Sequence, residues 1–274
     1  MPLSDNHLAG LSPIINIHAH IFPDKIQTRA VESIRTFYDL PMSKSGQTKE
    51  LLSEAAQFSV EKTVVFSTAT ARSQVRSIHA FIRDTVSMAP DALIGFGTLH
   101  PEMTPAEIEE EITVITEWGL KGVKLHPDFQ KIAADDPVVH SIASKLQGKL
   151  PILIHAGDYR FSYSHPEQIA RLAKDHPNLT IVAAHFGGWS EWYKAPEHLA
   201  GLSNVYVDTS SSLAFLSKEK ARELITVFGA DHVVFGTDYP MWSLEKELNL
   251  ISELGLSDSE LHKILFENAT KILY

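Results

Sequence analysis

The sequence predicts an α/β fold, a (β/α)8 barrel of the TIM type, and three observations support this prediction. Eight short apolar, β-branched runs recur along the 274 residues, and each is followed by a longer segment with helical spacing. The length suits one domain over 1–274, because such barrels commonly have about 250 residues. Polar residues end several of the runs, which is where barrel enzymes place their active sites. A doubly wound open sheet shows the same alternation, and periodicity alone does not exclude it.

The predicted elements follow one another in regular order. The strands are expected at 14–18, 62–67, 93–99, 122–126, 152–155, 180–185, 205–208 and 232–236. The helices are expected at 48–58, 71–88, 104–118, 137–147, 166–175, 217–228, 244–254 and 257–273. The helix start at Thr104 is the best marked, since Pro105 suits a first turn and Glu107 completes a capping box. The polar, turn-rich segment 41–47 is expected to overhang the active-site face.

The composition of the chain excludes or disfavours several classes of function. The formal net charge of -10 disfavours binding to nucleic acid or to an anionic membrane. The lack of cysteine excludes disulfides, thiolate metal sites and cysteine nucleophiles. No apolar run approaches the roughly 20 residues that span a bilayer, and no signal-peptide pattern begins the sequence. We therefore expect a cytoplasmic protein with a small-molecule substrate, and base rates for soluble enzymes favour a homodimer.

Metal-competent or charged residues close five of the eight predicted strands. They are His18 and His20, Lys124 and His126, His155, His185, and Asp238. Residues two apart in a strand point the same way, so His18 and His20 can present two imidazoles to one ion. Imidazoles with a carboxylate suit zinc-like divalent ions better than calcium or magnesium. A lone strand-end histidine is more often a hydrogen-bonded core residue, but packing alone hardly explains the whole set.

Six motifs in order carry a family resemblance. They are IHAHIFP at 17–23, GVKLHP at 122–127, IH at 154–155, AHFGG at 184–188, FGTDYP at 235–240 and ENATKIL at 267–273. As a set they resemble the amidohydrolase superfamily, specifically the amidohydrolase-related branch that includes aminocarboxymuconate-semialdehyde decarboxylase. The resemblance covers nearly the whole chain, and it implies a TIM barrel of the metal-dependent hydrolase type.

The resemblance also implies the roles of the strand-end residues. One divalent metal would be bound by His18, His20 and His155. Asp238 would ligate the metal or contact its water, and His185 would serve acid/base chemistry. We expect zinc, with manganese as the alternative. Such an ion lowers the pKa of bound water towards about 7, while a carboxylate accepts the proton and an imidazole donates one, tasks that Asp238 and His185 fit.

Four further residues are candidates for substrate binding. Lys124 matches the position at which related binuclear enzymes carry a carboxylated lysine between two metals. We favour instead a cation that binds a substrate carboxylate or pairs with Asp238, so a second metal is less expected. His126 faces the same way as Lys124 and is expected to line the pocket. Arg160 can clamp a carboxylate or be a solvated charge, and Trp189 can form a pocket wall or pack in the core.

Two further polar residues lie next to the candidate site residues in the sequence. Asn16 stands where the family often has an aspartate before the histidine pair, and an amide is a weaker acceptor if it supports a ligand histidine. Asp208 closes the seventh strand, and we interpret it as the cap of the next helix rather than as a group that orients substrate.

The expected reaction is hydrolysis of a small ester, lactone or amide by metal-activated water. The alternative is non-oxidative decarboxylation of an aromatic or unsaturated carboxylic acid, which the same ligand set supports in the resembling family. A non-catalytic barrel with a structural metal is the third possibility. His185, beyond the ligand set, argues for catalysis, because structural zinc sites are usually closed by four protein ligands.

Overall fold

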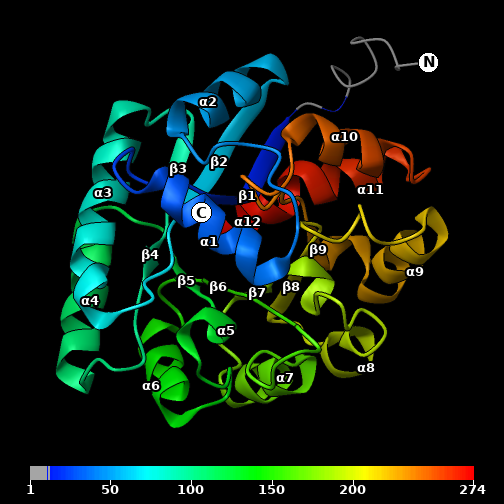
Figure 1. Ribbon diagram of the computed structural model, residues 1–274. Coiled ribbons are helices and arrows are strands. Elements are labelled where there is room, and N and C mark those ends of the chain that lie inside the picture. The colour runs from blue at the N-terminus through cyan, green and yellow to red at the C-terminus, as the bar shows by residue number, and fades with distance from the viewer. Residues whose placement is uncertain (1–10, 12) are drawn as a thin grey trace.

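The computed structural model describes residue 11 and residues 13–274, in which parallel strands form a ring surrounded by helices (Figure 1). The strands are β1 (Ile14–His20), β2 (Val60–Phe66), β3 (Leu93–Gly95), β4 (Gly97–Thr98), β5 (Val123–Leu125), β6 (Ile152–Ile154), β7 (Ile181–Ala183), β8 (Val205–Asp208) and β9 (Val233–Val234). Each predicted run contains a strand, and the third run is divided at Phe96 into β3 and β4. The predicted barrel is confirmed.

Hydrogen bonds join the two ends of the ring. The strand order is β1-β2-β3 in one sheet and β4-β5-β6-β7-β8-β9 in the other, and β3 and β4 are consecutive parts of one run. The backbone nitrogen of Ile17 donates to the carbonyl of Phe235 at 2.9 Å, which attaches the last strand to the first. A Cβ on Gly236 would lie 2.9 Å from the Cβ of His18. Glycine is therefore needed where the end of β9 passes the metal-competent end of β1.

Eight helices follow the strands in the predicted order. They are α2 (Thr48–Gln57), α3 (Val75–Met88), α4 (Pro105–Glu117), α6 (Pro137–Leu146), α7 (Pro166–Asp175), α9 (Lys218–Phe228), α10 (Leu244–Ser252) and, in two parts, α11 (Asp258–His262) with α12 (Asn268–Leu273). A π-helical turn, Lys263–Glu267, separates α11 from α12. The predicted capping box of α4 is present, because the side chain of Glu107 accepts from the backbone nitrogen of Thr104 at 2.8 Å. Within the described residues, no helix combines the length and apolar character that crossing a membrane requires.

Three helices were not predicted: α1 (Gln27–Tyr38), α5 (Pro127–Gln130) and α8 (Ala195–Leu199). Helix α1 lies in front of the ring of strands in Figure 1. It has no fully buried residue, and its apolar side chains are partly buried at the mouth of the ring. The segment 41–47 lies at the same face, where the backbone nitrogen of Lys44 donates to the carbonyl of Pro240 at 3.0 Å.

A change of register in β1 brings its histidines to the cavity. Ile15 and Ile17 are buried in the hydrophobic cluster inside the ring. The pairing of β1 with β2 then shifts between Asn16 and Ala19. After this irregularity the inward positions are those of His18 and His20, which line the cavity at the carboxyl end.

Candidate metal centre

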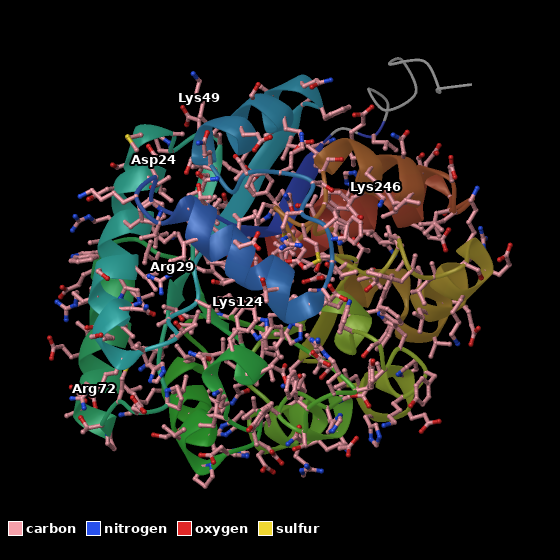
Figure 2. The ribbon with its side chains drawn as sticks, viewed as in Figure 1. Asp24, Arg29, Lys49, Arg72, Lys124 and Lys246 are labelled. Carbon is pink, nitrogen blue, oxygen red and sulfur yellow. The ribbon has the colours of Figure 1, made fainter. Side chains whose placement is uncertain are left out.

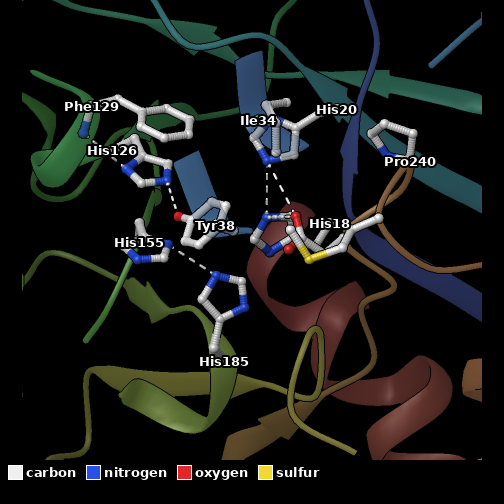
Figure 3. Close-up of a pocket in the computed structure, with 11 residues that line it drawn as sticks. His18, His20, Ile34, Tyr38, His126, Phe129, His155, His185 and Pro240 are labelled. Carbon is white, nitrogen blue, oxygen red and sulfur yellow. Dashed lines mark hydrogen bonds and ion pairs between the residues drawn. The ribbon is translucent and has the colours of Figure 1, made fainter. Parts of the chain in front are cut away.

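The carboxyl ends of the strands surround a small cavity (Figure 3). Its lining consists of His18, His20, Ile34, Tyr38, His126, Phe129, His155, His185, Asp238, Pro240 and Met241. The lining therefore includes all the residues that were predicted to bind metal or act as acid and base, together with the predicted pocket residue His126. The volume is about 20 Å³, which is room for about one water molecule.

Three donor atoms form a nearly equilateral triangle in this cavity. The Nε2 atoms of His18 and His20 are 3.4 Å apart. Asp238 Oδ1 lies 3.3 Å from Nε2 of His18 and 3.4 Å from Nε2 of His20. Ligand atoms about 2.0–2.1 Å from a tetrahedral ion are separated by roughly 3.3–3.4 Å. The triangle thus has the dimensions of one face of a zinc-type coordination shell.

The protonation states of His20 and Asp238 suit metal binding. Burial would lower the pKa of His18, but the charges of Asp208 and Asp238 raise it, so a divalent ion would displace a proton from His18. Burial lowers the pKa of His20 to about 4, so that its ring is neutral near pH 7. Burial would raise the pKa of Asp238, but the charge and hydrogen bond of His18 and the hydrogen bond of His20 hold that pKa well below its usual value. Neutral imidazoles and an ionised carboxylate are the forms that bind divalent ions.

Asp208 supports His18, which overturns its interpretation as a helix cap. Its carboxylate is fully buried, and its Oδ2 accepts from Nδ1 of His18 at 2.8 Å. Its Oδ1 accepts from the backbone nitrogen of His185 at 3.0 Å. Helix α9 is capped by Ser217 instead. The interpretation was wrong because the Asp208 side chain points into the barrel, where it fixes the ring of His18 with Nε2 facing the cavity.

Asn16 does not support a histidine ring. Its Oδ1 accepts from the backbone nitrogens of His18 at 3.2 Å and Thr237 at 3.1 Å. Its Nδ2 donates to Oγ1 of Thr237 at 3.0 Å. The amide thus ties β1 to the loop that carries Asp238, and it uses both its donor and its acceptor for this. The departure from the family pattern at this position therefore concerns the loop rather than the acceptor of a ligand ring.

Two further histidines face one another beside the triangle. Nδ1 of His155 lies 3.0 Å from Nε2 of His185. The other nitrogen of each ring faces a backbone carbonyl, that of Gly157 at 2.8 Å for His155 and that of Ser210 at 3.0 Å for His185. A carbonyl only accepts, so a neutral ring has its single proton there and directs a lone pair at the other histidine. Two facing lone pairs repel each other unless a cation lies against both, and this donor set therefore fits a divalent ion.

The predicted ligand histidines fall into two groups of neighbouring ligand atoms, and this grouping differs from the predicted ligand set. His185 has ligand atoms within 4.8 Å of those of His18 and Asp238, whereas His155 forms a second such group with His126 and Asp128. Burial lowers the pKa of His185 to about 4, and that of His155 falls well below its usual value for the same reason. Both are therefore neutral near pH 7, and the assignment of His155 as ligand and His185 as acid/base stays a prediction.

The backbone at two site residues is strained. His185 has φ 60° and Asp238 has φ 57°, in the left-handed region that residues other than glycine rarely adopt. Such residues persist only where surrounding contacts hold them, and they concentrate at active sites. The contacts here include the bond from the backbone nitrogen of Asp238 to the carbonyl of His18 at 2.9 Å.

Lys124, labelled near the middle of the molecule in Figure 2, lies beside the donor triangle but does not belong to the cavity lining. Its side chain is fully buried, with Nζ 3.5 Å from Nε2 of His18 and 5.1 Å from the ring centroid of Phe66. Burial lowers its pKa to about 8. Asp238 pairs with His18 and His20 and forms no ion pair with Lys124.

Arg160 and Trp189 also lie outside the cavity lining. The guanidinium of Arg160 binds both carboxylate oxygens of Asp158, at 2.9 and 2.7 Å. It also donates to the carbonyl of Phe37 at the end of α1, at 2.7 Å. The ring of Trp189 packs edge-on against Tyr38, with centroids 5.1 Å apart. Both residues therefore hold α1 at the mouth, and Arg160 uses three of its guanidinium N–H groups in these contacts.

Comparison with known proteins identifies the family. A family model described as amidohydrolase matches residues 15–274. The chain belongs to the amidohydrolase family. Among curated proteins, none matches this amidohydrolase.

Solved structures support the fold of this amidohydrolase. An uncharacterized TIM-barrel protein, Bb4693 from Bordetella bronchiseptica, is 21% identical with a TM-score of 0.80, over 95% of this chain and 98% of that one. A 5-carboxyvanillate decarboxylase from Novosphingobium aromaticivorans, complexed with manganese and 4-hydroxy-3-methoxy-5-nitrobenzoic acid, is 18% identical with a TM-score of 0.72, over 95% and 96%. A probable 2-pyrone-4,6-dicarboxylic acid hydrolase from Acinetobacter baumannii is 16% identical with a TM-score of 0.67, over 95% and 98%.

These findings confirm the resemblance seen in the motifs. The protein is an enzyme of the amidohydrolase superfamily, and its function is of that metal-dependent type. Sequence reasoning missed several parts of the site. Among them are the role of Asp208, the lining residues Phe129 and Met241, and the pair Ile34 and Tyr38 from α1, whose spacing of four residues on one helix face was the available signal.

Proposed function

We propose that this amidohydrolase is a hydrolase that cleaves a small ester, lactone or amide. The observation that carries the proposal is the triangle of donor atoms from His18, His20 and Asp238, with His185 beside it. A divalent ion held there, zinc or alternatively manganese, would polarise the scissile carbonyl and make water a better nucleophile. All the residues that line the cavity are described, and none of them is a lysine or an arginine.

The proposed roles of the chain's residues follow from their contacts. His18 and His20 would hold the ion through Nε2, and Asp208 fixes the orientation of the His18 ring. Ser211 donates to Asp238 Oδ2 at 2.5 Å, which leaves Oδ1 in the cavity to accept a proton from the attacking water. His185 directs its Nε2 lone pair into the same space. It can take up that proton and return it to the leaving oxygen or nitrogen.

Decarboxylation is the second candidate, because the manganese-bound Novosphingobium relative is a decarboxylase of an aromatic acid. A decarboxylase is expected to hold the substrate carboxylate with the metal and a cation. Arg160 is bound to Asp158, and Lys124 lies outside the cavity lining, with Nζ 3.5 Å from Nε2 of His18. The geometry therefore favours a neutral substrate, although the shared ligand set supports both reactions.

The test is a parallel assay of zinc- and manganese-loaded enzyme on 4-nitrophenyl acetate, δ-valerolactone and 5-carboxyvanillate. The proposal expects metal-dependent hydrolysis that falls about 10²- to 10⁴-fold in His185→Ala. The exposed His262 provides a matched control, since His262→Ala should leave the rate unchanged. Release of CO2 from 5-carboxyvanillate without hydrolysis of the other two would favour the decarboxylase. Metal retention with no turnover on any of the three would favour a structural metal.

A further inference from the structure

Helix α1 closes the cavity opposite the donor triangle. Ile34 and Tyr38 are its contributions to the lining, and Figure 3 shows the Tyr38 ring between His126 and His18. The cavity holds about one water molecule, so an organic substrate must press against these two side chains or displace α1. Any substrate bound at the donor triangle therefore meets the side of α1 that carries Tyr38.

The hydroxyl of Tyr38 has one contact among the described residues. Its Oη lies 2.9 Å from Nε2 of His126. The direction of this hydrogen bond depends on the other nitrogen of His126. That nitrogen, Nδ1, is 3.4 Å from the backbone nitrogen of Phe129 at the start of α5. A backbone N–H only donates, so Nδ1 of His126 is the acceptor.

The tautomer of His126 leaves the proton of Tyr38 free. An imidazolium ring has a proton on both nitrogens, so a ring whose Nδ1 accepts a hydrogen bond is neutral and has a single N–H. Because Nδ1 accepts, this N–H is at Nε2 and donates to Tyr38 Oη. The ring cannot turn easily, since it is stacked between Phe129 at 3.7 Å and His155 at 4.0 Å.

Tyr38 also keeps its proton under working conditions. A phenol ordinarily has a pKa of about 10, and burial raises that of Tyr38 further. The phenol is thus a permanent donor with no acceptor of its own among the described residues, at the wall of a cavity that faces the donor triangle.

We propose that Tyr38 is a substrate-binding residue, whose phenol donates a hydrogen bond to an acyl oxygen of the bound substrate. This inference rests on the proposed hydrolysis, because an ester, lactone or amide supplies that oxygen. His126 has a positioning role, since its N–H holds Tyr38 Oη in place and directs the phenol proton elsewhere. Substrate specificity would then depend on α1 as well as on the strand ends.

The test separates donation to the ligand from mere support of His126. Zinc-loaded wild type and Tyr38→Phe are titrated with acetophenone and with ethylbenzene, which differ by one carbonyl oxygen, and affinities are followed by ligand-observed NMR. A structural role of Tyr38 changes both affinities together. Donation to the carbonyl lowers only that of the ketone, and one hydrogen bond corresponds to a loss of about five- to tenfold in the ketone-to-hydrocarbon ratio.

The controls distinguish failure of the Tyr38 assignment from failure of the proposed hydrolase function. Tyr159→Phe removes a hydroxyl that is exposed at the neighbouring loop, so its ratio and the zinc content of both variants should equal those of wild type. An unchanged ratio in Tyr38→Phe, or no binding of acetophenone by wild type, would overturn the assignment. A reduced ratio in a protein without esterase activity would keep Tyr38 as a ligand donor and reject hydrolysis.

Discussion

Nδ1 of His18 donates to the carboxylate of Asp208 across 2.8 Å, a bond between residues 190 positions apart in the chain. Burial would raise the pKa of Asp208, but the charge and hydrogen bond of His18 lower it to about 2. The carboxylate is therefore ionised throughout the neutral range, and it holds the His18 ring with Nε2 towards the cavity. An orienting partner of this kind raises the basicity of a ligand histidine.

Asp208→Asn should weaken zinc binding about 10- to 100-fold, because an amide is a weaker acceptor for the His18 N–H. The measurement is the zinc dissociation constant, obtained by competition with a chromophoric chelator. Asp231→Asn is the matched control, since Asp231 is exposed and pairs with Lys263. Equal affinities of wild type and Asp208→Asn would show that His18 does not need this partner.

The contrast between His18 and Asp208 shows what the sequence could reveal about the site. His18 and His20 were found because a strand places residues two apart on one side, which is a local rule. The role of Asp208 depends on the meeting of β8 with β1, and no local pattern encodes that meeting. Asp208 was therefore assigned the local role that its type most often has, a helix cap.

For the fold, too, local patterns could be predicted from the sequence and tertiary effects could not. The eight apolar runs identified every strand, but most of the strands are shorter than the runs. His155 and His185, for example, were placed at the ends of strands, whereas β6 ends at Ile154 and β7 at Ala183. The side chains of these histidines contact the loop carbonyls of Gly157 and Ser210, which is a tertiary effect. Helix α1 was missed because it packs over the mouth without a buried face.

The two facing histidines allow the predicted division of roles to be tested. His18→Ala and His20→Ala should lose metal on dialysis, whereas His185→Ala should keep it and lose turnover. Elemental mass spectrometry of the three dialysed variants measures the retained ion per chain. Loss of metal from His185→Ala as complete as from His18→Ala would make His185 a ligand, which its grouping with His18 and Asp238 also allows.

Arg160→Ala should lower the stability of the protein and loosen α1. It should therefore weaken the binding of neutral as well as acidic substrates. Asp158 is buried, and in the variant its Oδ2 loses the guanidinium donor while its Oδ1 keeps the backbone nitrogen of residue 160. The lost donor should lower the unfolding free energy by about 1–3 kcal/mol. Urea unfolding measures this cost, with Arg171→Ala as an exposed control. The Michaelis constants of neutral and acidic substrates should rise together. A rise confined to acids would restore Arg160 as a carboxylate clamp.

Glu247 gives the stability of the protein a pH dependence that can be isolated. Its carboxyl is fully buried on α10, and neither oxygen has a hydrogen-bond partner among the described residues. Burial raises its pKa well above the usual value, so the folded protein holds a proton that the unfolded chain releases above about pH 4.5. This group therefore makes the protein less stable as pH rises through the neutral range.

Glu247→Gln should remove that loss of stability. The unfolding free energy of the variant relative to wild type should increase by about 1.4 kcal/mol per pH unit between about pH 5 and 7. Urea unfolding at several pH values measures the difference, and Glu245→Gln on the exposed side of α10 is the control. A difference that stays constant with pH would mean that Glu247 ionises in the folded protein as it does in the unfolded chain.

The chemical state of Lys124 determines whether the site holds one metal ion or two. Its amine is buried 3.5 Å from Nε2 of His18, and its pKa of about 8 leaves an appreciable neutral fraction near neutral pH. If it stays an amine, purified wild type should contain about one zinc or manganese per chain, and Asp238→Asn should contain less. Near two ions per chain would indicate a carboxylated lysine that bridges them, and Lys124→Met should then lower the content by about one. Because methionine fills a similar volume without the amine, a content near one in both proteins would show that Lys124 does not hold a metal.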